Sequence, residues 1–272
     1  MPVVGSKQVE RRGSRRSGEA QTGPRLRSRE PPEKGQKIGR ALAPLPAVSL
    51  TAAFPEIAEA IPPADRAHAE HTLIAPVLAG RDEDLADLFA AMGPDVFDLL
   101  IIDGVVIKET ALAGRSALQL LGPGDFLAPP LTTLRQTESR ALSRYLAHGP
   151  VSLAAIDGRY RQAARHWPGL VDILHDRLGQ QTHRASMHLA MLHLARTEDR
   201  VRLLFADLAE RFGRVTADGI LIDLSLTHET IGGLVGSRRP SVTLALQTLS
   251  SEALLMRVGH DRWKLAAPGV SW

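Results

Sequence analysis

The feature that most constrains this chain is the stretch 226–250, LTHETIGGLVGSRRPSVTLALQTLS, which has the pattern of two short helices joined by a tight turn. Thr227 is placed to cap the first helix, because its hydroxyl oxygen can accept a hydrogen bond from a free backbone N–H. Gly236 stands where this helix must end, and glycine adopts the positive φ of such a turn at low cost. Pro240 fits the first turn of the second helix, where it removes no intrahelical hydrogen bond. The stretch predicts a helix-turn-helix.

Polar side chains gather at the start of the second helix, where Arg238, Arg239, Ser241 and Thr243 are expected to be exposed. Guanidinium groups and hydroxyls in this position can bind phosphates and read guanine in the major groove of DNA. An ordinary helical hairpin with two solvated arginines has the same pattern. The residues alone leave both interpretations open.

The sequence THETIGGLVGSRRPSVTLALQTL, followed by LLMRVGHDRWKL, resembles the winged helix-turn-helix of the Crp/Fnr family of bacterial transcription regulators. The resemblance implies an α+β fold with an N-terminal antiparallel β-roll or jelly roll, a long dimerisation helix and a C-terminal winged helix-turn-helix. It implies a cytoplasmic homodimer that binds double-stranded DNA, with RNA polymerase as a further partner.

On this basis we divide the chain into four parts. They are a basic tail expected to be disordered (1–45), a sensor-like β-roll (46–166), a dimerisation helix (167–197) and the DNA-binding domain (198–272). Within the tail, residues 1–40 hold 11 Lys and Arg against 4 Glu, a charge of +7 in a chain whose total is +3. The tail is either an arm that attracts phosphates or a dispensable leader, such as one from a misassigned start codon.

Composition excludes several classes of site. The chain has no cysteine, so it has no disulfide, thiolate zinc site or cysteine-ligated iron–sulfur cluster, and it cannot sense oxygen as Fnr-like members do. Its 10 histidines are scattered without a metal-binding pattern, which predicts no metal site. No apolar run reaches membrane-spanning length. No nucleophile elbow, phosphate loop or recognisable pair of catalytic carboxylates is present, so we expect no enzymatic activity.

The segment from 45 to 160 reads as short strands broken by Gly and Pro, with one helix at 82–93. Such a pattern predicts an antiparallel roll. The expected strands are HTLIAPVLAG, FDLLIIDGVVIKETAL, RSALQLLGPGDFL, SRALSRYLAH and PVSLAAID.

Within the roll, LLGPGDFLAPP resembles the turn that holds phosphate and ribose in the cyclic-nucleotide-binding members of the family. Those members continue the turn with Gly-Glu, but this chain has Ala128 and Pro129, and proline has no N–H to donate. The arginines nearby, Arg135 and Arg140, do not reproduce the family's Arg-Ser pair. We therefore expect no response to cyclic AMP and identify no cofactor. Two alternatives stay open: the roll binds a different small ligand, or it is only a scaffold.

A long helix is expected from Gly169 to about Arg196, because only Gly179 interrupts it. Its apolar positions follow spacings of three and four, which favours packing against a second copy over burial within one monomer. The seam comprises Leu170, Leu174, Leu178, Gln181, Ala185, Leu189 and Leu192. A dimer of this kind predicts an operator with an inverted repeat.

The resemblance assigns base reading to Arg239, which can fork onto guanine O6 and N7. Pro240 and Leu244 replace a glutamate and an arginine that other members use, so the code for the half-site should differ. Contacts with the DNA backbone are assigned to Thr227, His228, Arg238, Ser241 and Thr243. In the expected wing, Arg257, His260, Arg262 and Lys264 supply further donors. The alternative is an architectural, nucleoid-type protein that binds DNA without selectivity.

Overall fold

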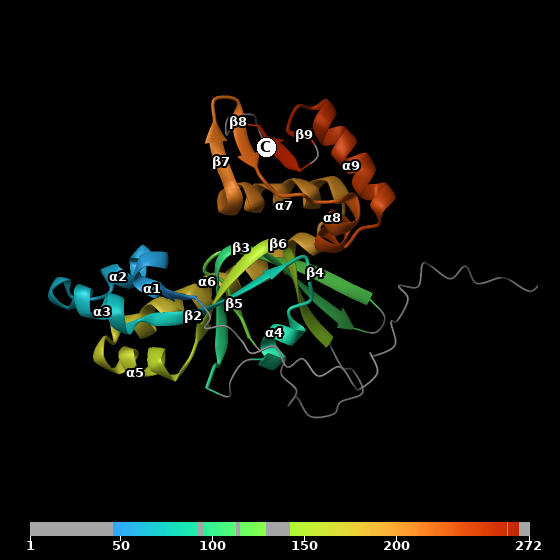
Figure 1. Cartoon of the computed structure of the whole chain (residues 1–272). Helices are drawn as coiled ribbons and strands as arrows, with labels where there is room; N and C mark the ends of the chain where they lie inside the picture. Colours follow the sequence, from blue (N-terminus) through green and yellow to red (C-terminus); the bar gives the residue numbers. More distant parts are fainter. Residues whose placement is uncertain (1–45, 92–94, 113–114, 129–141, 260, 267–272) are drawn as a thin grey trace, which may run out of the picture. The chain divides into compact units, whose positions relative to one another are not determined.

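The computed structural model describes residues 46–91, 95–112, 115–128, 142–259 and 261–266. The first of its two sheets is antiparallel, with strands in the order β1-β2-β6-β3-β4 and with β5 paired to β3 (Figure 1). Its strands are β1 (Ala47–Ser49), β2 (Ile74–Arg81), β3 (Asp98–Leu112), β4 (Arg115–Leu121), β5 (Phe126–Leu127) and β6 (Leu142–Ile156). This sheet is the predicted antiparallel β-roll.

One long strand replaces two expected ones. The segments 139–148 and 150–157 were predicted to be separated at Gly149-Pro150, but β6 runs through both of these residues. Gly149 has a positive φ of 77°, and Pro150 pairs with Arg81 at the end of β2. The opposing strand β3 shifts register between Ile101 and Val105, so the ladder absorbs the irregularity as a bulge.

Short helices occupy a region where the sequence had indicated strands and only one helix. They are α1 (Leu50–Ala53), α2 (Pro55–Glu59), the 3-10 helix η1 (Pro63–Asp65) and α3 (Arg66–Thr72). The expected strand at 71–80 therefore starts later, at Ile74. Leu50, Phe54, Ile57 and Ile61 recur at helical spacing and are all buried. Because prolines divide this periodic run into pieces, it did not read as one helix. The expected helix at 82–93 starts later, at Ala86, and α4 is described as Ala86–Ala91.

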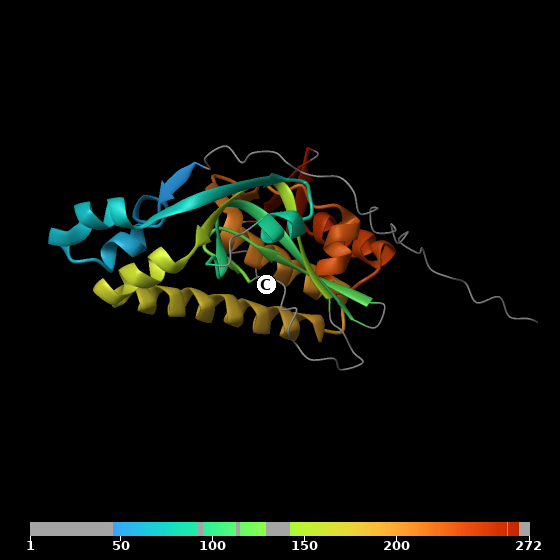
Figure 2. The same ribbon diagram turned by 60° about the horizontal axis from the view of Figure 1, so that its bottom comes forward.

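Three helices follow the roll: α5 (Gly158–His166), α6 (Gly169–Leu192) and α7 (Thr197–Phe212). Figure 2 shows α6 running along the underside of the sheet. The predicted single seam of α6 is divided between two faces. Leu170 is buried and Gln181 binds the backbone of β5, whereas Leu178 and Leu189 are 48% and 61% exposed. The reason is that the predicted seam combined residues from two stripes. Leu170 and Gln181 lie on one stripe, and Leu178 and Leu189 lie on another, roughly a quarter turn away around the helix.

The C-terminal part of the chain combines two helices with a second antiparallel sheet of order β7-β8-β10-β9. Its elements are β7 (Gly213–Thr216), β8 (Gly219–Ile222), α8 (His228–Val235), α9 (Arg239–Ser251), β9 (Leu255–Val258) and β10 (Arg262–Leu265). The predicted helix-turn-helix and wing hairpin are present. The alternating segment GILIDLSL (219–226) predicts a strand, and the observed strand β8 covers only its first half. The strand β7 was not predicted.

The described residues between 46 and 266 belong to one compact unit. The four-part division proposed from the sequence remains a prediction. No helix in the described part of the chain is long and apolar enough to cross a membrane.

Candidate nucleic-acid interface

Local chemistry fixes both ends of α8. The hydroxyl of Thr227 accepts a hydrogen bond from the backbone N–H of Thr230 at 3.0 Å, so the predicted cap is formed. Gly236 has φ 62° and ψ 35°, the left-handed conformation expected of a helix-ending glycine. The N–H of Ser237 closes the turn on the carbonyl of Gly232 at 2.9 Å. Together these bonds set the direction in which α9 begins.

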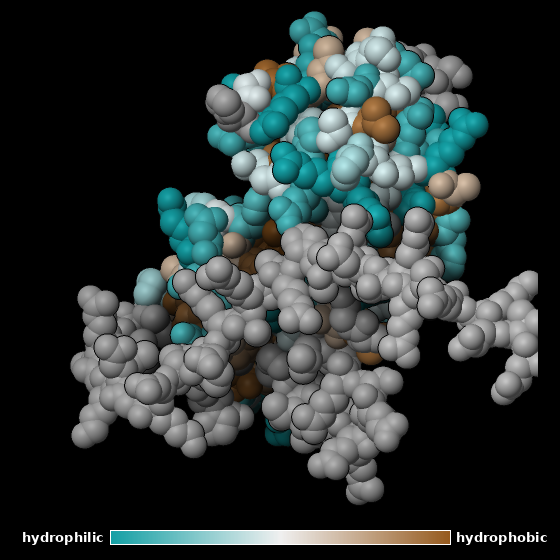
Figure 3. Space-filling model, turned by 90° about the vertical axis from the view of Figure 1, so that its right-hand side faces the viewer, coloured by the Kyte–Doolittle hydropathy of each residue, from teal (hydrophilic) through white to brown (hydrophobic). Residues whose placement is uncertain are grey.

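The packing of α8 and α9 leaves one edge of α9 free. Ile231, Leu234, Val242 and Leu249 are buried in a core shared with Phe205 of α7 and Trp263 of β10. Arg238, Arg239 and Ser241, at the start of α9, are exposed. The face of the molecule over α8 and α9 is largely hydrophilic, with a few isolated apolar spots (Figure 3).

Two of the residues that were assigned to contacts with the DNA backbone, His228 and Thr243, lie next to each other. Nδ1 of His228 and Oγ1 of Thr243 are 2.9 Å apart, and the Thr243 hydroxyl donates to the carbonyl of Arg239 at 3.0 Å. The imidazole thus links the first turn of α8 to the second turn of α9. The hydroxyl of Thr227 is used in the cap. The DNA contacts assigned to these residues remain predictions.

Two positively charged side chains, Arg257 and Arg239, lie near His228. Partial burial lowers the pKa of this histidine, and the charges of Arg257 and then Arg239 lower it further. Arg257 lies in β9 of the wing, with its guanidinium carbon 5.6 Å from the centre of the Trp263 ring. The helix-turn-helix and the wing therefore contribute to one electropositive surface, which we call the reading surface: Thr227, His228, Arg238, Arg239, Ser241, Thr243 and Arg257.

Two other polar groups of the wing are paired within the protein. Nζ of Lys264 lies 3.4 Å from a carboxylate oxygen of Asp218, between β7 and β8. Ser225 donates to Asp261 at 2.9 Å. His260 lies outside the described residues. Lys264 is therefore already engaged by an acidic side chain of the protein itself.

The roll turn that was compared with a nucleotide cradle is satisfied by the chain itself. The N–H of Gly122 donates to Oδ2 of Asp125 at 2.9 Å, and the N–H of Gly124 donates to the carbonyl of Ile101 at 2.8 Å. Gln181 of α6 accepts from the N–H of Phe126 and donates to its carbonyl, both at 3.0 Å. These N–H groups are not free to bind a phosphate.

A side chain of α6 fills the space beside this turn. The guanidinium of Arg177 packs against Gly124, pairs with Glu56 and lies 4.3 Å from the centre of the Phe54 ring. A side chain at position 124 would collide with it. Ala128 is exposed just after β5. Pro129, Arg135 and Arg140 lie outside the described residues, so their part in the prediction is not tested.

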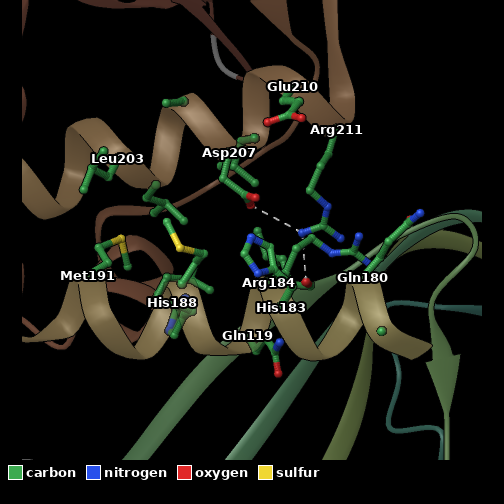
Figure 4. Close-up of a pocket in the computed structure, with 17 residues that line it drawn as sticks. Gln119, Gln180, His183, Arg184, His188, Met191, Leu203, Asp207, Glu210 and Arg211 are labelled. Carbon is green, nitrogen blue, oxygen red and sulfur yellow. Dashed lines mark hydrogen bonds and ion pairs between the residues drawn. The ribbon is translucent and has the colours of Figure 1, made fainter. Parts of the chain in front are cut away.

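A cavity of about 900 Å³ lies between α6, α7 and β4 (Figure 4). Its lining mixes apolar, basic and acidic side chains, including Met187, His188, Leu203 and Asp207. Burial lowers the pKa of His188, against the opposing charge of Asp207. Among the described residues, no three His, Cys, Asp or Glu side chains are grouped as metal ligands.

No protein-family model and no curated protein sequence matches this chain. Several solved structures, in contrast, are similar to this chain. FixK2 from Bradyrhizobium japonicum has a TM-score of 0.55 at 19% identity, covering 71% of this chain and 93% of that one. A mutant of CooA from Carboxydothermus hydrogenoformans gives 0.54 at 18%, covering 70% and 83%. A CRP-family transcriptional regulator from Thermus thermophilus gives 0.51 at 21%, covering 70% and 91%.

These similarities, together with the roll, the long helix and the winged helix-turn-helix, define the class of fold. The chain has the fold of the Crp/Fnr transcription regulators. The α+β fold expected from the sequence is thereby confirmed.

Proposed function

We propose that the chain is a sequence-specific DNA-binding transcription regulator that acts as a homodimer. The observation that carries the proposal is the exposed start of α9, where Arg238, Arg239 and Ser241 project from a helix whose direction is fixed by the Thr227 cap and the Gly236 turn. A helix held in this way can enter the major groove with its first residues toward the bases. The proposed role is binding rather than catalysis.

The exposed side chains of α6 support a dimer. Val171, Leu178 and Leu189 are 54%, 48% and 61% exposed, although they are large and apolar. Their separations of about two and three helical turns place them on one stripe. A stripe of this kind is buried when two such helices pack side by side. Two reading surfaces related by a twofold axis would then bind an inverted repeat.

The experiment is selection of bound sequences from random double-stranded DNA, followed by footprinting at moderate salt. A discrete inverted repeat is the expected result. Uniform coverage without a preferred sequence would instead favour the architectural protein, the second candidate function. The same selection with added cyclic AMP should return the same sequences with the same enrichment.

Substitution of Arg239 tests the reading surface directly. Arg239→Ala should remove most of the preference for the selected operator over scrambled DNA, a loss of about 10- to 100-fold, because one bidentate guanine contact contributes roughly 1–3 kcal/mol. Non-specific binding at low salt should persist. Gln247→Ala, at an exposed position further along α9, is the matched control and should keep the preference. If Arg239→Ala retains full preference, the assigned role is wrong.

Arg238→Ala separates phosphate contacts from base reading. It should weaken binding to operator and scrambled DNA alike, and should reduce the salt dependence of binding by about one released counterion. An unchanged slope of log Kd against log salt concentration would contradict a phosphate contact. Arg239→Ala is therefore expected to lose sequence preference, whereas Arg238→Ala is expected to lose affinity for any DNA sequence.

A further inference from the structure

Asp125 is the only charged or polar side chain of the described residues that is fully buried, with 1% of its surface exposed. Its Oδ2 accepts from the N–H of Gly122 and from Nη2 of Arg211, both at 2.9 Å, and its Oδ1 pairs with Arg184. Both carboxylate oxygens are thus engaged, as a buried charge requires.

Asp125 and its two arginine partners lie in three separate parts of the fold. Asp125 itself lies in the turn between β4 and β5, Arg184 lies in the middle of α6, and Arg211 lies in the last turn of α7. In Figure 4, Arg184 and Arg211 extend from the two helices toward each other. Arg211 also donates to the carbonyl of Leu120 at 3.2 Å and pairs with Asp207 at 3.4 Å. One carboxylate therefore joins the roll, the long helix and the helix that precedes the reading motif.

A second contact, which is apolar, joins the same regions. Leu118 of β4 packs against Gly233 of α8 so closely that a Cβ on Gly233 would lie 2.5 Å from a Leu118 methyl carbon. Val105, Ile107 and Leu120 of the roll belong to the same buried cluster as the core of the helix-turn-helix. The first helix of the reading motif thus rests on β4.

We propose that Asp125, with Arg184 and Arg211, is an internal clamp that holds the reading motif on the roll in a DNA-binding form without a bound effector. This inference rests on the proposed function. Its basis is that the chain itself satisfies this turn. The N–H groups of Gly122 and Phe126 donate to side chains, the N–H of Gly124 donates to a backbone carbonyl, and Arg177 fills the space beside Gly124. In this clamped form Arg238, Arg239 and Ser241 are exposed.

The test compares Asp125→Asn with a matched variant. Asn is nearly the same size and keeps an oxygen for Gly122, but it removes the charge that pairs with both arginines. Glu109→Gln is the control, because Glu109 pairs with Arg144 at 2.5 Å and both residues lie in strands of the roll. Operator affinity is measured on the full-length protein without effector, and amide hydrogen exchange is measured by mass spectrometry.

We expect Asp125→Asn to bind the operator at least about tenfold more weakly than the native protein, and to exchange faster in the 122–126 turn and in the last turn of α7. Glu109→Gln should match the native protein in both respects. Leu118→Ala removes the apolar contact without disturbing a buried charge, so it provides a second variant if Asp125→Asn does not fold. It should also bind more weakly and should loosen α8.

Three results would overturn the clamp. One is native operator affinity and native exchange in both Asp125→Asn and Leu118→Ala. Another is exchange that accelerates throughout Asp125→Asn rather than at the named segments, which would make Asp125 a general stability residue. The third is a native protein whose operator affinity rises about tenfold or more with cell extract or cyclic AMP. If the native protein selects no DNA sequence, the proposed function fails, and the exchange comparison still tests the clamp.

Discussion

At the scale of single residues, the proposed contact of His228 with a DNA phosphate predicts how DNA binding depends on pH. Partial burial and the charges of Arg257 and Arg239 lower the pKa of His228 and so favour its neutral imidazole in the free protein. A phosphate placed against this group would raise the pKa again. Binding would then take up a proton, and the affinity for DNA should rise as the pH falls from about 7.5 to about 6.

The measurement is operator affinity by fluorescence anisotropy across this pH range at constant ionic strength. His228→Gln should flatten the pH dependence, whereas His193→Gln, at an exposed histidine after α6, should leave it unchanged. Equal slopes in the native protein and in His228→Gln would contradict the phosphate contact assigned to His228.

A second residue, Asp98, affects stability rather than binding. Burial at the start of β3 raises the pKa of Asp98 to about 6, and its charge contributes to the raised pKa of Tyr145. Because the folded protein disfavours the ionised carboxylate, Asp98 destabilises the fold above pH 6, and this effect disappears as the pH falls toward the ordinary value of 3.8.

Asp98→Asn should therefore raise the free energy of unfolding at about pH 8, with a gain that shrinks as the pH falls through about 6. Urea denaturation at several pH values measures this. Asp103→Asn, at an exposed position of the same strand, is the control and should show little change. A gain that does not depend on pH would show that ionisation of Asp98 is not its source.

At the scale of elements, the sequence predicted best where one local pattern determines the structure. Thr227, Gly236 and Pro240 each act within a few residues of their own position, and the helix-turn-helix forms as expected. The helices between residues 50 and 72 were missed because their periodicity is divided by prolines. The continuous strand β6 was missed because Gly149-Pro150 has the composition of a turn, and only pairing with β2 and β3 keeps it extended.

Gly236 gives a direct test of such local control. Its left-handed conformation, φ 62°, disfavours any residue with a Cβ, and that atom would lie 3.2 Å from Leu192. Gly236→Ala should lower the free energy of unfolding by about 1 kcal/mol or more. Gly179→Ala is the matched control of opposite sign, because Gly179 lies within α6 with nothing near the added atom, and alanine there should stabilise by roughly 0.5–1 kcal/mol. Equal effects of the two substitutions would contradict this explanation.

At the scale of the whole molecule, the residues that connect the roll to the reading motif were not identified from the sequence. Asp125 is separated from Arg184 by 59 positions and from Arg211 by 86. No local periodicity relates such residues, and only the folded chain brings them together. The same holds for Arg177, which fills the space beside Gly124. The loss of the nucleotide cradle stays a prediction from Ala128 and Pro129, and the sequence did not indicate that Arg177 lies against this turn.

The proposed dimer depends on a contact between the α6 helices of two protomers. Leu189→Glu would place a charge in the exposed stripe of α6, where it would be buried in a dimer without a partner. We expect the native protein to sediment as a dimer and Leu189→Glu as a monomer. The operator affinity of the variant should fall by about a hundredfold or more, because two linked half-site contacts become independent.

Met187→Glu is the matched control, since Met187 is 59% exposed but lies about 200° around the helix from Leu189. It should remain dimeric and should bind the operator normally. Leu189→Glu should still bind an isolated half-site as weakly as the native protein does, because its reading surface is unchanged. A native protein that sediments as a monomer, or a Met187→Glu variant that dissociates as readily as Leu189→Glu, would show that the Val171–Leu178–Leu189 stripe is not the dimer contact.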